Sequence, residues 1–166
     1  MVGLDRLFPR WFPSHFLRDM DYERTQVVEQ VPGAFFLIRR ALFEQLGGFD
    51  ERFFMYYEDV DLSYRARLAG WNTLFIGDIF VQHVGGGTTE PIKGRRLFYS
   101  LRSRVLYAGK HFGRARAIGL AAAVLVLEFP VRFLRALLRF SWAEVKATCE
   151  ACLLFLRNFP ETIKCL

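Results

Sequence analysis

The sequence predicts an α/β domain followed by a C-terminal amphipathic helical region, and three observations lead to this fold class. Short apolar runs typical of strands alternate with short helical segments over residues 27–96. Over residues 97–166, leucine, phenylalanine, alanine and valine recur at helical spacing among scattered cations. Hydrophobic residues make up 52% of the 166 residues, which is ample for a folded core and argues against disorder.

The first 26 residues contain Pro9, Pro13 and mixed charges, which predict an irregular, loop-rich lead-in. They include no uninterrupted apolar core and no small-residue cleavage site, so we expect no signal peptide. The runs VVEQV and AFFLI come next, separated by a Pro-Gly pair. Both predict short strands, because β-branched and aromatic residues are enriched in strands.

Two short helices are expected around the middle of the α/β region, each ended by a glycine. The first covers Arg39–Leu46 and is followed by Gly47, and the second covers Asp59–Ala69 and is followed by Gly70. Glycine adopts at little cost the left-handed backbone conformation with which many helices end. These pairs of periodic segment and stop residue therefore predict both helix ends.

The runs WNTLFIGD and IFVQHV predict two further strands, with a turn at Gly77 and Asp78 between them. The following GGGTTEP predicts a loop. Three consecutive glycines allow the backbone of this loop to approach a neighbouring group closely.

The C-terminal region contains two amphipathic helix candidates, Leu97–Phe112 and Ala143–Phe159. Between them, Ile118–Val126 is apolar, but it falls short of the roughly 20 apolar residues that a membrane-spanning helix needs. The residues that interrupt this stretch are Glu128, Pro130, Arg132 and Arg135. We interpret the region as helices lying in a membrane interface, and a packed helical hairpin is the alternative.

The net charge of +6 is unevenly distributed along the chain. Residues 1–90 hold 9 Lys and Arg against 13 Asp and Glu, whereas residues 91–166 hold 14 against 4. The basic half is rich in Leu, Phe, Ala and Val and lacks a compact Lys/Arg tract, which suits an anionic bilayer surface better than a nucleic acid. We therefore expect a peripheral protein on the cytoplasmic face of a membrane and no nucleic-acid partner.

The three cysteines, Cys149, Cys152 and Cys165, all lie near the C-terminus. This odd count implies no disulfide framework and favours a reducing compartment. Cys149 and Cys152 form a CxxC, but no second pair or nearby histidine accompanies it. Small residues on a helix explain this pair better than zinc or redox chemistry.

The segment FFMYYEDVDL places Glu58, Asp59 and Asp61 directly behind an aromatic block. Acids in the first turn of a helix interact favourably with its dipole, by about 0.3 to 1 kcal/mol each, which explains one of them. Alternatively, the aromatic side chains partly desolvate a carboxylate and raise its pKa toward the range useful to a general base. The spacing alone leaves both interpretations open.

A second candidate is His83, at the end of a strand-like run beside the triple glycine. A histidine in this position can ligate a metal or contact a phosphate, although single histidines are often structural.

The order of these motifs resembles the acceptor-side half of family 2 glycosyltransferases, especially the rhamnosyltransferase-like branch. The resemblance covers VPGAFFLIRRALFEQLGGFDERFFMYYEDVDLSYRARLAGW and QHVGGGTT, from about Val31 to Arg104. It implies part of a GT-A fold, a doubly wound α/β sandwich. It also implies transfer of a sugar from a nucleotide-sugar donor to a glycan or polyprenyl-linked acceptor, with inversion of configuration.

Carried onto this sequence, the resemblance makes Asp59 the general base, which takes the proton of the acceptor hydroxyl, and Glu58 its support. His83 matches a histidine that in several relatives joins a divalent cation, Mg²⁺ or Mn²⁺, on the departing diphosphate. Gly33 and Ala34 match a segment that lines the acceptor side.

Two further assignments concern the acceptor and phosphate contacts. Tyr57 and its aromatic neighbours are expected to form the wall of the acceptor pocket. Arg102 and Arg104 match a basic stretch after the glycine loop and are candidates for phosphate or lipid contact, with solvated helix arginines as the alternative.

Complete members of this family begin with a nucleotide-binding half that carries a DxD motif, and no such half is recognised here. Asp19-Met20-Asp21 has that spelling, but its irregular surroundings favour a coincidence. We therefore expect a C-terminal part of a transferase that is inactive or very weak alone and completed by a separately encoded N-terminal half. A non-catalytic membrane-surface protein derived from a glycosyltransferase is the alternative.

Overall fold

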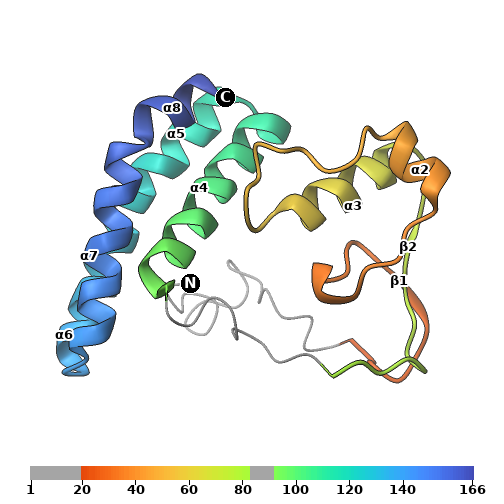
Figure 1. Ribbon diagram of the computed structural model, residues 1–166, viewed down its shortest axis with the longest axis horizontal. Coiled ribbons are helices and arrows are strands. Elements are labelled where there is room, and N and C mark those ends of the chain that lie inside the picture. The colour runs from red at the N-terminus through yellow and green to blue at the C-terminus, as the bar shows by residue number, and fades with distance from the viewer. Residues whose placement is uncertain (1–19, 83–91) are drawn as a thin grey trace.

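The computed structural model describes residues 20–82 and 92–166, which form an N-terminal lobe and a C-terminal helical bundle lying side by side (Figure 1). The N-terminal lobe, residues 20–82, contains β1 (Gln26–Val28), the 3₁₀ turn η1 (Gly33–Phe35), α2 (Arg40–Gln45), α3 (Glu58–Leu68) and β2 (Thr73–Phe75). The helical bundle, residues 92–166, contains α4 (Lys93–Phe112), α5 (Arg114–Ala123), the π-helical turn η3 (Val124–Glu128), α6 (Phe129–Leu138), α7 (Trp142–Arg157) and α8 (Phe159–Lys164).

The sheet of the N-terminal lobe is one antiparallel ladder between β1 and β2, in which Val27 is opposite Leu74. The strand predictions at VVEQV and WNTLFIGD are confirmed in position but are too long. The strand predicted at AFFLI is wrong, because this run holds η1 and then extended backbone. Within the described part of IFVQHV no strand forms either.

The physical reason is that a strand requires a hydrogen-bonding neighbour as well as a suitable composition. Neither AFFLI nor IFVQ has such a neighbour among the described residues. Several of their apolar side chains are consequently in solvent, with Leu37 94% exposed and Phe80 85% exposed.

Both predicted helices of the α/β region are present, and glycines end them as expected. Gly47 and Gly48 follow α2 with φ of 74° each, and the Gly48 N–H donates to the carbonyl of Phe43 at 2.9 Å. Gly70 follows α3 with φ of 84°, and the N–H of the next residue, Trp71, donates back to Ala66 at 3.0 Å. These left-handed glycines satisfy carbonyls that the helix ends leave unpaired.

The apolar stretch Ile118–Val126, expected to be too short for a membrane-spanning helix, is part of one continuous helix from Arg114 to Leu138, formed by α5, η3 and α6. Pro130 lies at the first turn of α6, where the π-helical turn before it changes the backbone pairing. A π turn of this kind accommodates a residue that cannot donate to the regular ladder. By length and composition the helix could cross a bilayer, and 28% of its most apolar stretch is buried in the protein.

The core of the helical bundle lies where α4 packs against α5 and α7 (Figure 1). α6 and α7 pack against each other as a hairpin, which is the alternative to membrane-interface helices given in the sequence analysis. Its outer surface nevertheless carries exposed apolar side chains, among them Val126, Leu127, Leu134, Leu138, Trp142, Leu153 and Leu156. A membrane-interface role for this surface stays a prediction.

Candidate active site at the start of helix α3

The turn that leads into α3 has an unusual backbone. Tyr56 and Tyr57 both adopt left-handed conformations, with φ of 65° and 69°. For residues with a Cβ atom this costs roughly 1 kcal/mol or more each, and such strain concentrates at functional sites. The turn brings Glu58, Asp59 and Asp61 into the first turns of α3, where each acid has a different environment.

Asp59 is hydrogen bonded to a segment 26 residues earlier in the chain. Its Oδ2 accepts the backbone N–H of Gly33 at 2.8 Å, and its Oδ1 accepts that of Val60 at 2.8 Å. A Cβ atom added to Gly33 would lie 3.2 Å from Asp59 Oδ2 and 3.4 Å from Asp59 Cβ, so a side chain there would crowd the carboxylate. The structure therefore brings together two of the predicted site residues.

Glu58 is half-buried, and its Oε2 has no hydrogen-bond partner among the residues that the structure describes. Burial, reinforced by the negative charge of Asp59, raises the pKa of Glu58 above its ordinary value. The unpaired Oε2 is itself buried, which favours the neutral form of this carboxyl group. The two neighbouring acids thus differ in their hydrogen-bond partners.

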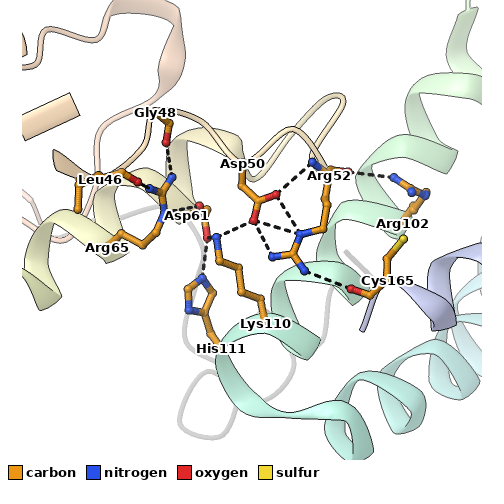
Figure 2. Close-up of polar contacts among 10 residues, drawn as sticks. All are labelled: Leu46, Gly48, Asp50, Arg52, Asp61, Arg65, Arg102, Lys110, His111 and Cys165. Atoms are coloured by element: carbon orange, nitrogen blue, oxygen red, sulfur yellow. Dashed lines mark hydrogen bonds and ion pairs between the residues drawn. The ribbon is translucent and has the colours of Figure 1, made fainter. Parts of the chain in front are cut away.

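Asp61 is completely buried and anchors α3 to α4 (Figure 2). Its carboxylate oxygens lie 2.7 Å from Arg65 Nε, Lys110 Nζ and His111 Nε2. Burial alone would raise the pKa of Asp61, but the hydrogen bonds from Lys110, His111 and Arg65 outweigh it and lower the pKa. Asp61 therefore has a structural role, because it pairs with side chains of α3 and α4.

The same network fixes the GGFDE segment before the aromatic block (Figure 2). Arg65 donates to the carbonyls of Leu46 and Gly48, at 2.7 Å each. Asp50 pairs with Arg52 and Lys110 at 2.7 Å each, and the Arg52 guanidinium, with a smaller contribution from Lys110, lowers the pKa of Asp50 against the effect of burial. This network was not predicted from the sequence. Its acids and cations lie in separate motifs, and their presence in the sequence was the only indication of it.

The aromatic block packs mostly onto α4. Phe53 is buried below Lys110, whose Nζ lies 5.7 Å from the ring centroid. The Tyr57 ring lies 5.4 Å from that of Tyr107, and burial raises the pKa of Tyr57. Tyr56 instead lines a cavity in the helical bundle. The block is therefore largely the contact surface between the lobe and the bundle.

The two arginines predicted to contact phosphate both have partners inside the protein. Arg102 donates to the carbonyl of Arg52 at 3.1 Å. Arg104 pairs with the buried Glu128, which also accepts hydrogen bonds from Arg132 at 2.8 and 3.0 Å. In this arrangement both arginines hold structural elements together.

The remaining predicted residues are Ala34 and His83. Ala34 is exposed in η1, next to Gly33. His83 lies outside the described residues. Within residues 20–82 and 92–166, no three His, Cys, Asp or Glu side chains converge as a metal site.

Comparison with known proteins identifies relatives of this chain. Residues 12–104 match the family model described as glycosyltransferase-like family 2. The N-acetylglucosaminyl-diphospho-decaprenol L-rhamnosyltransferase of Mycobacterium tuberculosis is 40% identical over 116 residues, which are 67% of this chain and 38% of that protein.

Two further relatives each match about half of this chain. Rhamnosyltransferase WbbL of Escherichia coli K12 is 30% identical over 84 residues, which are 51% of this chain and 32% of WbbL. The low-salt glycan biosynthesis hexosyltransferase Agl10 of Haloferax volcanii is 45% identical over 94 residues, or 53% of this chain and 29% of Agl10. The chain thus spans less than half the length of the curated relatives it matches, and no solved structure matches it.

Proposed function

Because the chain belongs to glycosyltransferase-like family 2, we propose that it forms the acceptor side of an enzyme that transfers a sugar from a nucleotide-sugar donor to a glycan or lipid-linked acceptor. The observation that carries this proposal is the hydrogen bond between Asp59 Oδ2 and the N–H of Gly33. It joins the acidic motif to the segment expected to line the acceptor site.

Asp59 is the proposed general base. Its carboxylate accepts the proton of the acceptor hydroxyl as that oxygen forms a bond to the anomeric carbon of the donor sugar. The bond from that carbon to the nucleoside diphosphate breaks on the opposite face, which inverts the configuration. The hydrogen bonds from Gly33 and Val60 hold the carboxylate in one orientation, so little reorganisation is needed when the acceptor arrives.

Glu58 is proposed to support this step. Its partly buried carboxylate and raised pKa allow it to hold a proton at a pH where an exposed carboxylate would be ionised. In its protonated form, Glu58 could donate a hydrogen bond to the acceptor. In its ionised form, it would oppose further negative charge next to Asp59.

The divalent cation and its His83 ligand stay a prediction. The described residues contain no group of three His, Cys, Asp or Glu side chains that could hold a cation, and no step above depends on a metal. We assign donor binding to a nucleotide-binding half. That half would be a separate polypeptide or another part of the same polypeptide.

The acceptor class is proposed from the relatives and from the surface of the bundle. The name of the M. tuberculosis relative specifies a sugar on a diphospho-decaprenol, which is a lipid. The helical bundle has exposed apolar side chains together with the basic charge of its sequence. Both features suit an enzyme held peripherally at the cytoplasmic face of a membrane.

The same surface supports a second candidate function. A chain that uses its basic, apolar bundle to bind membranes or a partner protein would need no working base. In that case Asp59 would serve only to connect η1 to α3.

The test combines the purified chain with a separately expressed donor-binding N-terminal part of the M. tuberculosis relative. Transfer of radiolabelled sugar from a panel of UDP-, dTDP- and GDP-sugars to lipid-linked N-acetylglucosamine is measured. Asp59→Asn is expected to reduce transfer by roughly 10²-fold or more, since general-base catalysis typically contributes 10²- to 10⁴-fold. Unchanged transfer by a folded Asp59→Asn chain would refute the assignment of the base, and absence of transfer by the unmodified mixture would favour the non-catalytic alternative.

A further inference from the structure

A cavity of about 430 Å³ lies between α4, α6 and α7, separate from the acids of α3. Two cations line it from α4, Lys93 and Arg96, and two from α6, Arg132 and Arg135. The acidic side chain in its lining is Glu144 of α7. The cavity therefore carries a net positive charge contributed by two separate helices.

This composition favours an anion with several acceptor oxygens. Guanidinium groups present planar, paired donors that match phosphate oxygens, and a lysine adds a compact positive charge. A concave site also concentrates the field of its charges more than a flat surface does. A phosphate or diphosphate group has the matching charge and geometry.

The cavity is connected to the acidic motif through Tyr56. Tyr56, which has a left-handed backbone, lines the cavity, and Asp59 follows three residues later. Three residues of chain span at most about 11 Å. The backbones of Asp59 and of the cavity-lining Tyr56 are therefore within about 11 Å of each other.

The helix on the other side of the cavity has an apolar surface open to solvent. On α6, Leu134 is 57% exposed and Leu138 is 72% exposed. Phe140, in the turn that follows, is 89% exposed, and Trp142, the first residue of α7, is 76% exposed. Aromatic and aliphatic side chains beside basic residues are typical of a surface that contacts the headgroup region of a bilayer.

We propose that this cavity binds the diphosphate of a lipid-linked sugar acceptor, so that the sugar extends toward Asp59 and the lipid chain leaves along α6. The inference rests on the proposed function for its choice of acceptor. The chemistry that it requires is an anionic phosphate group attached to a lipid, with the cavity cations as donors.

The experiment measures binding of the full chain to phosphatidylcholine vesicles by flotation, without any sugar transfer. One set of vesicles contains a polyprenyl diphosphate, a second contains phosphatidylglycerol at equal negative charge, and a third is neutral. Free pyrophosphate is added as a competitor in a further arm. We expect the tightest binding to the polyprenyl diphosphate vesicles and at most partial competition by pyrophosphate.

The test variant is the triple substitution Lys93→Ala, Arg96→Ala and Arg135→Ala. Arg132 is retained because it also holds the buried Glu128. The matched control removes the same charge outside the cavity, with Arg116→Ala, Lys146→Ala and Arg157→Ala. The cavity variant is expected to bind polyprenyl diphosphate vesicles roughly tenfold or more weakly, and the control less than about threefold more weakly.

Loss of the fold is checked by circular dichroism and by the single variant Arg135→Ala. Arg135 is exposed and forms no ion pair within the described residues, so its removal should leave the bundle intact while still weakening binding. Equal losses in the cavity and control variants, or equal binding to phosphatidylglycerol and polyprenyl diphosphate, would overturn the inference.

The outcomes also separate this inference from the proposed function. Selective binding that depends on the cavity, without transfer in the enzymatic assay, would support the site and refute the transferase activity. Transfer that depends on Asp59, with binding unaffected by the cavity variant, would support the transferase activity and refute the cavity as a binding site.

Discussion

Replacing Asp61 with asparagine removes the charge on which Arg65, Lys110 and His111 converge (Figure 2). The carboxylate is completely buried, and loss of one partner from a buried ion pair typically costs about 3–5 kcal/mol. Asparagine keeps one acceptor oxygen, and Lys110 keeps its pairing with Asp50 at 2.7 Å. We therefore expect the lower end, about 3 kcal/mol of unfolding free energy.

For a chain of this size, 1 kcal/mol changes the midpoint of thermal unfolding by roughly 2–4 °C. The Asp61→Asn protein should thus unfold about 6–12 °C below the parent chain in thermal circular dichroism. The matched control is Glu144→Gln, which removes an exposed acid and should change the midpoint by about 2 °C or less. A decrease for Asp61→Asn no larger than that of the control would refute the anchoring role.

The same cluster determines a pH dependence. The pKa values of Asp61 and Asp50 are lowered in the folded protein, so their stabilising contribution is present above their unfolded pKa values and is lost as the pH falls through their folded values. Stability should therefore decrease below about pH 4, near the ordinary pKa of aspartate. Asp61→Asn should make this decrease shallower in urea titrations between about pH 3 and 7, a range that includes that pKa.

Two further substitutions test other parts of the structure. The pKa of Glu58 is raised in the folded protein, so its contribution to stability declines as the pH rises from its unfolded to its folded pKa. Glu58→Gln should remove this decline of the unfolding free energy with pH. An unchanged pH dependence in urea titrations would contradict the assignment. A Cβ atom on Gly77 would meet the backbone of Glu23 at 2.5 Å and the nitrogen of Arg24 at 2.8 Å, so Gly77→Ala should lower the unfolding free energy by about 1–3 kcal/mol. The control is Gly119→Ala, because a Cβ atom there has open space and the backbone is not left-handed.

The helices could be predicted from the sequence because their signals are local. Apolar spacing and a following glycine are both contained within a dozen residues, as for α3 and Gly70. Strands depend on distant partners, and the apolar runs around Leu37 and Phe80 look like strands but have no neighbour to pair with among the described residues. Composition alone cannot supply this information.

The candidate site, like the fold, could be predicted only in part. The sequence motif placed Gly33 and Asp59 in one site, and the structure brings them into contact. It could not distinguish Asp61 from its neighbours, because the partners that make this acid structural, Lys110 and His111, lie about 50 residues further along the chain. The basic cavity was likewise hidden, since its cations come from helices that are adjacent only after folding.

The π-helical turn η3 accommodates one additional residue within the helix that runs from Arg114 to Leu138. In such a turn a carbonyl pairs with the N–H five residues later instead of four, so the helix on either side of the turn keeps its orientation. Deleting one residue from Val124–Glu128 would therefore restore regular pairing and leave Arg132 and Arg135 facing the cavity. A deletion in a regular part of the same helix would instead rotate the residues that follow by about 100°.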